Sequence, residues 1–329
     1  MKTKTSLILI LYLTICFLFT DILLAQRTEK ADNSLAQSQL RFDITSLEKI
    51  YLDPETILKD PDAFWKNDEA YILVTEWHRR TNYPLDMEKW IKRVEKIRDL
   101  PIEERENHEQ LIAGRNLKEI EKSFFKKAIP HIYSFMPPNT PMLNTTLYFT
   151  TEIEASGFQA KGNIVINILN HEKTNIFVHE LFHQAYVFVN QKRTDERLEN
   201  EILESLIFSL INEGMATYVG FKALPDFPYY WGEDYDLLQN SSDLLRLHKN
   251  LNDLFQNAES MTEEKLREVS WEIGVTQRAY YVVGAYMALI IDEKLGREEL
   301  IKTYSAGPLS FIKKYNSICE SNMKIVEFH

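Results

Sequence analysis

Cysteine is scarce in this sequence, which contains only Cys16 and Cys319 among 329 residues. Cys16 lies in an N-terminal segment that we expect to be removed, so Cys319 would have no second cysteine with which to form an internal disulfide. The stability of the fold must therefore come from a buried core rather than from crosslinks. The sequence also contains no internal repeat and no low-complexity tract. About 300 residues are enough for one large domain or for two coupled lobes.

Basic residues are fewer than acidic ones. The chain has 38 Lys and Arg against 49 Asp and Glu, which gives a formal net charge of −11. Phosphate backbones and anionic lipid surfaces repel a chain of this charge. We therefore expect no nucleic-acid partner and no attraction to anionic membranes.

One apolar run, Leu7–Thr20, follows a start that contains two lysines. This order is typical of a secretory signal, and Asp21 interrupts the run before it is long enough for a comfortable membrane span. We expect residues 1–25 to be a signal peptide that ends at Ala25, with no stable membrane insertion after cleavage. The predicted location is periplasmic or extracellular. An uncleaved N-terminal segment that anchors the protein in the membrane is the alternative.

The chemistry of the chain is indicated by His179-Glu-Leu-Phe-His183, within an apolar run at 175–189 that predicts a buried helix. Residues i and i+4 share one face of a helix, so His179 and His183 can bind one cation. Glu180 can address a water bound to that cation. This pattern is the signature of zinc metalloproteases and predicts one Zn²⁺. A surface helix with two solvated histidines is the alternative. The apolar residues around the motif argue against it, because they predict a buried helix, and buried imidazoles need partners such as a metal ion.

A third protein ligand is usual for catalytic zinc, and no third histidine follows at the spacing that metzincins use. Apolar residues recur at helical spacing along Leu198–Phe221, which predicts a second helix. Glu213 ends its apolar stripe and is followed by small residues, so we expect this carboxylate to face inward and bind the metal. Competing carboxylates lie near the polar start of the same helix: Glu199, Glu201 and Glu204.

Together, His179-Glu-Leu-Phe-His-Gln184 and Ile211-Asn-Glu-Gly-Met-Ala-Thr-Tyr218 resemble the gluzincin zinc peptidases, most closely those of the aminopeptidase N type. The resemblance implies that His179, His183 and Glu213 bind zinc and that Glu180 is the general base. The Gly-x-Met-Glu-Asn stretch with which those aminopeptidases hold a free amino end is absent. The plan of the chain is therefore more similar to the bacterial zinc-dependent peptidase families of the same clan.

A further match is Tyr281-Val-Val-Gly284, which resembles the Tyr-x-x-Gly helix of those enzymes. The resemblance implies that Tyr281 donates a hydrogen bond to the oxyanion, with Tyr280 as the fallback. Ordinary core packing is the alternative for both tyrosines.

The implied reaction is hydrolysis of a peptide or protein substrate by a zinc-activated water. In the enzymes that this chain resembles, a strand before the metal helix offers its free edge to the substrate, and we expect part of Gly157–Asn167 to be that edge. A fully paired strand is the alternative. Two other functions remain open: a non-catalytic zinc protein that binds peptides or glycans, and a metallohydrolase of another amide or ester.

The predicted fold is α+β and mostly helical, with a small sheet next to the His-Glu-x-x-His helix and a helical C-terminal lobe, as in a gluzincin or thermolysin-like core. Strand-like alternation occurs at 145–150 and 162–168, and 157–162 could form a hairpin turn between them. The predicted divisions follow the signal peptide. They are a linker or N-terminal extension (26–59), a helical N-terminal part (60–142) and the peptidase core (143–329).

Overall fold

A computed structural model describes residues 39–81, 85–109, 125–151, 157–167, 175–195, 198–223 and 232–328. The predicted signal peptide, residues 1–25, lies outside these ranges. Among the helices inside them, none has the length and apolar character that a membrane crossing requires. The fold is mostly helical with one four-stranded sheet, which confirms the predicted α+β class.

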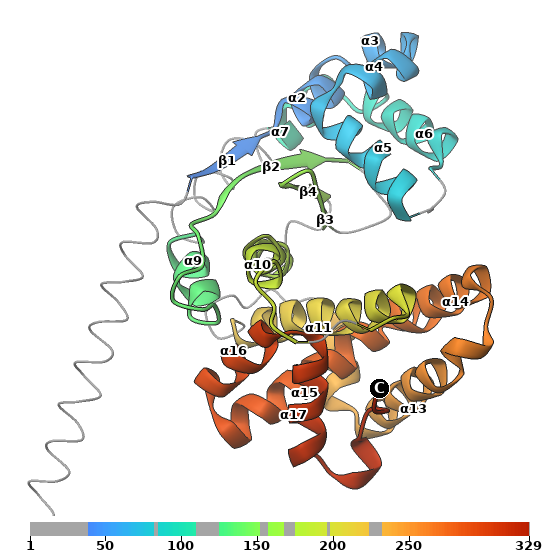
Figure 1. Cartoon of the computed structure of the whole chain (residues 1–329). Helices are drawn as coiled ribbons and strands as arrows, with labels where there is room; N and C mark the ends of the chain where they lie inside the picture. The colour runs from blue at the N-terminus through green and yellow to red at the C-terminus, as the bar shows by residue number, and fades with distance from the viewer. Residues whose placement is uncertain are drawn as a thin grey trace, which may run out of the picture.

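The N-terminal part is a group of short helices on one side of the sheet (Figure 1). Aspartates set several of their starts: the side chains of Asp53, Asp60 and Asp86 each accept a hydrogen bond from a backbone N–H three residues later. A proline follows two of these caps, where its missing N–H costs nothing. These helices are α2 (Thr45–Leu52), α3 (Pro54–Lys59), α4 (Pro61–Asn67), α5 (Glu69–Thr81), α6 (Met87–Arg98) and α7 (Ile102–Glu109). A further helix, α9 (Phe125–Tyr133), lies on the other side of the sheet.

The sheet has the strand order β1-β2-β4-β3. Its strands are β1 (Gln39–Asp43), β2 (Asn144–Thr150), β3 (Gly157–Ala160) and β4 (Asn163–Asn167). β1, β2 and β4 run parallel, and β3 pairs antiparallel with β4. Lys161 and Gly162, which form the β3–β4 turn, both have positive φ, as a two-residue type I′ hairpin requires.

One expectation about this region needs correction, and one segment contains elements that the sequence did not indicate. The turn occupies two residues rather than the whole of 157–162, because 157–160 pairs as a strand with β4 instead of looping between β2 and β4. β1, α2 and α3 also lie inside 26–59, the segment assigned to a linker or extension. The polar composition of β1 hid it, because an edge strand that pairs on one side needs few apolar residues.

Below the sheet in Figure 1, α10 (Asn175–Asn190) is seen end-on, and α11 (Glu201–Lys222) runs across the view beneath it. α11 begins three residues later than predicted, because the Asn200 side chain caps it by accepting from the N–H groups of Ile202 and Leu203. The remaining elements are α12 (Gly232–Gln239), α13 (Ser241–Asn257), η4 (Ala258–Ser260), α14 (Glu263–Ser270), the π-helix η5 (Trp271–Thr276), α15 (Ala279–Leu295), α16 (Arg297–Ala306), α17 (Pro308–Ile318) and η6 (Ser321–Met323).

Candidate metal centre

Three polar residues of α10 are buried in the middle of the molecule. His179 is 3% exposed, Glu180 5% and His183 7%. Burial follows from their apolar neighbours, since Phe177, Val178, Leu181 and Phe182 of the same helix are all almost fully inaccessible. Burying imidazole and carboxyl groups without partners costs free energy. The site is therefore described by the groups that these three side chains contact.

Glu213, from the middle of α11, meets both histidines. Its Oε2 lies 3.2 Å from Nε2 of His179 and 3.3 Å from Nε2 of His183, and the two Nε2 atoms are 3.0 Å apart. The three side chains each offer one ligand atom, and these atoms all lie within 4.8 Å of one another. Among the described residues, this is the group of histidine and acidic side chains with a geometry that could hold a metal ion.

The competing carboxylates of α11 do not reach this group. Glu199 and Glu201 are exposed. Glu204 is bound elsewhere: its Oε1 lies 2.7 Å from a guanidinium nitrogen of Arg193, and its Oε2 accepts from the backbone N–H of Leu198. The distances therefore favour Glu213 as the third ligand over its three rivals.

The donor set fits a zinc ion. Two imidazoles and one carboxylate are the ligands of one class of catalytic zinc site, with a further position left for water. Burial would raise the pKa of Glu213, but the neighbouring His183 and His179 hold it well below its usual range. The pKa of His179 is lowered by burial and by His183. Glu213 is thus held as an anion and His179 as a neutral imidazole, the forms that bind metals.

Asn212, directly before Glu213, orients the second histidine. Its Oδ1 lies 3.0 Å from Nδ1 of His183, so the Nδ1–H group of the ring can donate to it. Burial would lower the pKa of His183, but the Glu213 carboxylate raises it to about 9. A metal ion would therefore displace the Nε2 proton of this ring, while Nδ1–H keeps donating to Asn212. Asn212 belongs to the motif recognised in the sequence, but its contact with His183 was not predicted. The two side chains meet only because α10 and α11 cross.

Glu180 lies on the same helix as the two histidines and is buried with them. Burial raises the pKa of its carboxyl group to about 7, with His183 acting in the opposite direction. A Cβ atom added at Gly157 would lie 3.1 Å from Cγ of Glu180, so glycine lets β3 pass close to this side chain. The side chain of Glu180 therefore passes close to the first residue of β3.

The β3–β4 hairpin is tied to α10 by two glutamines. Nε2 of Gln159 donates to the backbone oxygen of Glu180 at 3.1 Å, and Nε2 of Gln184 donates to the backbone oxygen of Asn163 at 3.2 Å. Strand order makes β3 an edge strand of the described sheet. The two hydrogen bonds therefore hold the β3–β4 hairpin against α10.

Of the two candidate tyrosines, Tyr281 lies beside the ligands. Its ring stacks on that of His179, with centroids 6.0 Å apart and an interplanar angle of 19°. Tyr280, one residue earlier, packs over Gly274 of the π-helix, where an added Cβ would lie 2.1 Å from its ring. Burial and then Glu213 raise the pKa of Tyr281 above its ordinary value, so its hydroxyl keeps its proton.

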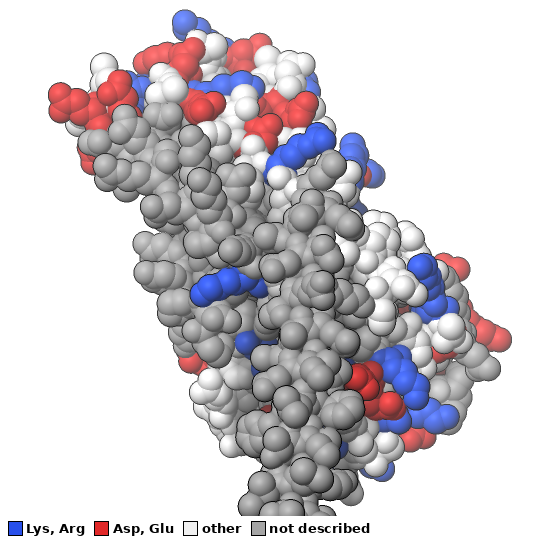
Figure 2. Space-filling model, turned by 90° about the vertical axis from the view of Figure 1, so that its left-hand side faces the viewer, with Lys and Arg blue, Asp and Glu red and all other residues white. Residues whose placement is uncertain are grey.

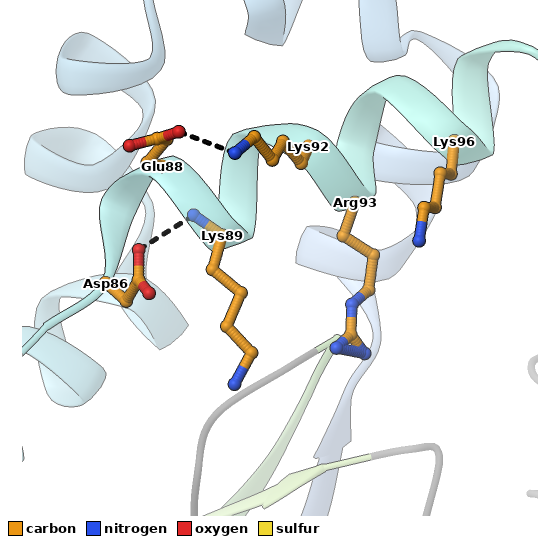
Figure 3. Close-up of a pocket in the computed structure, with 6 residues that line it drawn as sticks. All are labelled: Asp86, Glu88, Lys89, Lys92, Arg93 and Lys96. Atoms are coloured by element: carbon orange, nitrogen blue, oxygen red, sulfur yellow. Dashed lines mark hydrogen bonds and ion pairs between the residues drawn. The ribbon is translucent and has the colours of Figure 1, made fainter.

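A basic pocket of about 440 Å³ lies apart from these residues, along α6 (Figure 3). The side chains of Lys89, Arg93 and Lys96 extend from the same side of the helix, while Lys92 is paired with Glu88 at 2.5 Å. None of the lining residues belongs to the cluster around Glu213.

The comparison with protein families agrees with this site. The chain belongs to the family described as "Putative zinc dependent peptidase (DUF5700)", whose model matches residues 48–324, a range that contains every residue of the cluster. No curated protein and no solved structure matches the chain. The family supports a zinc-dependent hydrolase, and the group formed by His179, His183 and Glu213 is where a zinc ion fits.

Proposed function

We propose that this protein is an exported zinc-dependent peptidase of the gluzincin type. The observation that carries the proposal is the convergence of His179, His183 and Glu213 within 4.8 Å, with the buried carboxyl group of Glu180 on the same helix. Zinc bound there would lower the pKa of a coordinated water to about 7 and polarise the carbonyl group of a substrate. The remaining work falls to side chains of this chain.

Glu180 is the proposed proton carrier. Its carboxylate accepts the proton of the attacking water and delivers it to the leaving nitrogen. A base with a pKa near 7 can do both at neutral pH, and burial places Glu180 in that range. Of the neighbouring charges, His183 lowers the pKa of this carboxyl group and Glu213 raises it.

Tyr281 is the proposed oxyanion donor. Its protonated hydroxyl belongs to a ring that stacks on His179, one of the three proposed ligands. A hydroxyl hydrogen bond that strengthens as charge develops on the carbonyl oxygen stabilises the transition state.

The substrate is proposed to bind along β3. Ala160 and Asn163 flank the two-residue turn as a hydrogen-bonded pair, so the backbone groups of Gly157 and Gln159 face away from β4. The Arg80 side chain, which donates to the backbone oxygen of Gln159 at 3.0 Å, lies on that outward side. A peptide added there as a strand would pass Gly157, the residue that borders Glu180.

The charge of the surface supports a peptide rather than a polyanion as the partner. Acidic and basic side chains are interspersed over the described part of the face in Figure 2. With a net charge of −11, the chain gains no general attraction to nucleic acid. Export is proposed from the sequence of residues 1–25 alone.

The decisive experiment is a panel of internally quenched fluorogenic peptides, incubated with the purified protein after export, with and without a chelator. Cleavage that the chelator abolishes and added zinc restores is the expected result. Parallel assays with ester and non-peptide amide substrates separate a peptidase from another hydrolase. Zinc binding at one equivalent without hydrolysis of any substrate would instead indicate the non-catalytic binding protein.

A further inference from the structure

The segment that leads into Tyr281 has an unusual backbone. The π-helix η5 ends at Thr276, and α15 begins at Ala279. Between them, Arg278 adopts the left-handed conformation, with φ 68° and ψ 17°. This conformation is uncommon for residues other than glycine and costs free energy, and π-helical turns are frequent at functional sites.

A buried ion pair holds Arg278 in this conformation. Its Nε donates to Oδ1 of Asp234 and its Nη2 donates to Oδ2, both at 2.7 Å. The Asp234 side chain is 1% exposed and that of Arg278 is 15% exposed. Asp234 comes from α12, so the pair ties the start of α15 to a helix that is more than forty residues earlier in the chain. Such a bidentate pair fixes the plane of the guanidinium group as well as its position.

That plane lies on the ring of Tyr281. The Cζ atom of Arg278 is 3.4 Å from the centroid of the ring, and the nearly parallel ring of His179 also stacks on it. The phenol ring therefore contacts both a guanidinium group and a proposed metal ligand. Neither the αL backbone nor the partnership with Asp234 was predictable from the local sequence around Tyr281.

We propose that Asp234 and Arg278 form a positioning pair, which holds the hydroxyl of Tyr281 toward the metal centre by clamping its ring. This inference rests on the proposed function, in which Tyr281 donates to the oxyanion. Arg278 is not itself a catalytic residue here, because its donors in the pair are directed to Asp234. Its effect on the reaction passes through the orientation of Tyr281.

A double-mutant cycle in the zinc-loaded, full-length protein tests this dependence. Arg278→Gln should lower kcat by on the order of tenfold, with KM and zinc content unchanged, because the phenol loses its fixed orientation. Tyr281→Phe keeps the ring and therefore the stack but removes the hydroxyl. In the Tyr281→Phe background, Arg278→Gln should change kcat less than about twofold, since the group that it positions is already gone.

The chain offers a matched control in Arg297. Its Cζ atom also lies 3.4 Å from an aromatic centroid, that of Phe135, and its guanidinium group is paired with Asp292 at 2.6 Å. Arg297→Gln should lower thermal stability as Arg278→Gln does, but it should leave kcat within about twofold of the parent. Arg278→Lys keeps the positive charge without the planar group, so it should remain as impaired as Arg278→Gln.

A phosphinic peptide, which mimics the tetrahedral geometry of the addition step, gives a readout other than turnover. Arg278→Gln and Tyr281→Phe should each weaken its binding in calorimetry, and the double variant should bind no worse than Tyr281→Phe. If the losses of the two single variants multiplied in the double variant, in kcat or in binding, the positioning role would be overturned. A loss of kcat in Arg297→Gln as large as that in Arg278→Gln would overturn it as well. Neither result would affect the proposed peptidase activity. A parent protein that hydrolyses no peptide would overturn both proposals.

Discussion

Gly214 of α11 faces Gly284 of α15 with no side chain between the two backbones. A Cβ added at Gly214 would lie 2.3 Å from Cα of Gly284, and one added at Gly284 would lie 2.3 Å from the backbone oxygen of Leu210. Gly214 follows Glu213, the proposed third ligand, and Gly284 lies one turn after Tyr281. The close approach of these two glycines is therefore what brings the proposed oxyanion donor to the metal ligands.

Gly284→Ala should disturb both stability and activity. The new methyl group meets backbone atoms that cannot rotate away, so the helices must separate, at a cost of about 1–3 kcal/mol. Hydrolysis should fall because Tyr281 moves with α15. Urea denaturation and peptide hydrolysis measure the two effects. Ser209→Ala, on a less crowded part of α11, should stay within about 0.5 kcal/mol of the parent. A Gly284→Ala protein with parental stability would show that the crossing is not tight.

Glu180→Gln should keep bound zinc but lose hydrolysis by roughly a thousandfold, because the amide cannot accept the proton of the attacking water. Elemental analysis and steady-state kinetics on the same preparation separate the two properties. Glu201→Gln, an exposed change on α11, serves as the control. If the Glu180 variant cleaved peptides as fast as the parent, the proposed general base would be wrong.

Glu213→Ala should lose zinc on dialysis, since it removes the only anionic ligand of the three. The exposed Glu199, a rival from the sequence pattern, provides the comparison: Glu199→Ala should retain about one zinc per chain. Metal content measured by elemental analysis decides between them. Unchanged zinc in Glu213→Ala would assign the third ligand to another residue.

Asp195→Ala should destabilise the fold by about 2 kcal/mol without affecting the metal. Oδ2 of Asp195 accepts from the backbone N–H of Leu309 at 2.8 Å, and Oδ1 pairs with Arg193 at 2.7 Å. The side chain thus joins the α10–α11 connection to the start of α17. It fits there because Gly307 has no Cβ. Chemical denaturation of the metal-loaded protein measures the loss. If the free energy of unfolding changed by less than about 0.5 kcal/mol, the contacts of Asp195 would not contribute measurably to stability.

His248 should contribute to loss of stability in acid. Burial lowers the pKa of its imidazole, although the hydrogen bond to the backbone oxygen of Met323 at 2.7 Å opposes the shift. The folded pKa thus lies below the ordinary value of 6.5. Below pH 6.5 the unfolded chain binds more protons at this residue than the folded one does, so stability falls as the pH drops toward the folded pKa. Above pH 6.5 the contribution is constant.

The measurement is the free energy of unfolding between pH 8 and pH 5 for the parent and for His248→Gln, which retains a donor for Met323. The difference between the two proteins should be constant above pH 6.5 and should shift in favour of the variant below it. Parallel curves across the whole range would show that His248 does not titrate differently on folding.

Local patterns in the sequence account for much of the fold. Helices α4, α5, α6, α7 and α9 lie within residues 60–142, the part that the sequence predicts to be helical, since helix formation depends on neighbours in the chain. The predicted strands at 145–150 and 162–168 correspond to β2 and β4. β1 and β3 were missed, because a short edge strand owes its pairing to a distant partner more than to its own residues.

The sequence by itself determined the metal-binding helix, because the spacing of His179 and His183 on one helical face needs no information beyond 3.6 residues per turn. It also named Glu213 and the tyrosine pair as candidates. Only the tertiary structure decided that Glu213 rather than Glu204 reaches the histidines, that Tyr281 rather than Tyr280 lies beside them, and that Asp234 is the partner of Arg278. These outcomes depend on where helices cross, and crossings are set by packing between residues far apart in the chain.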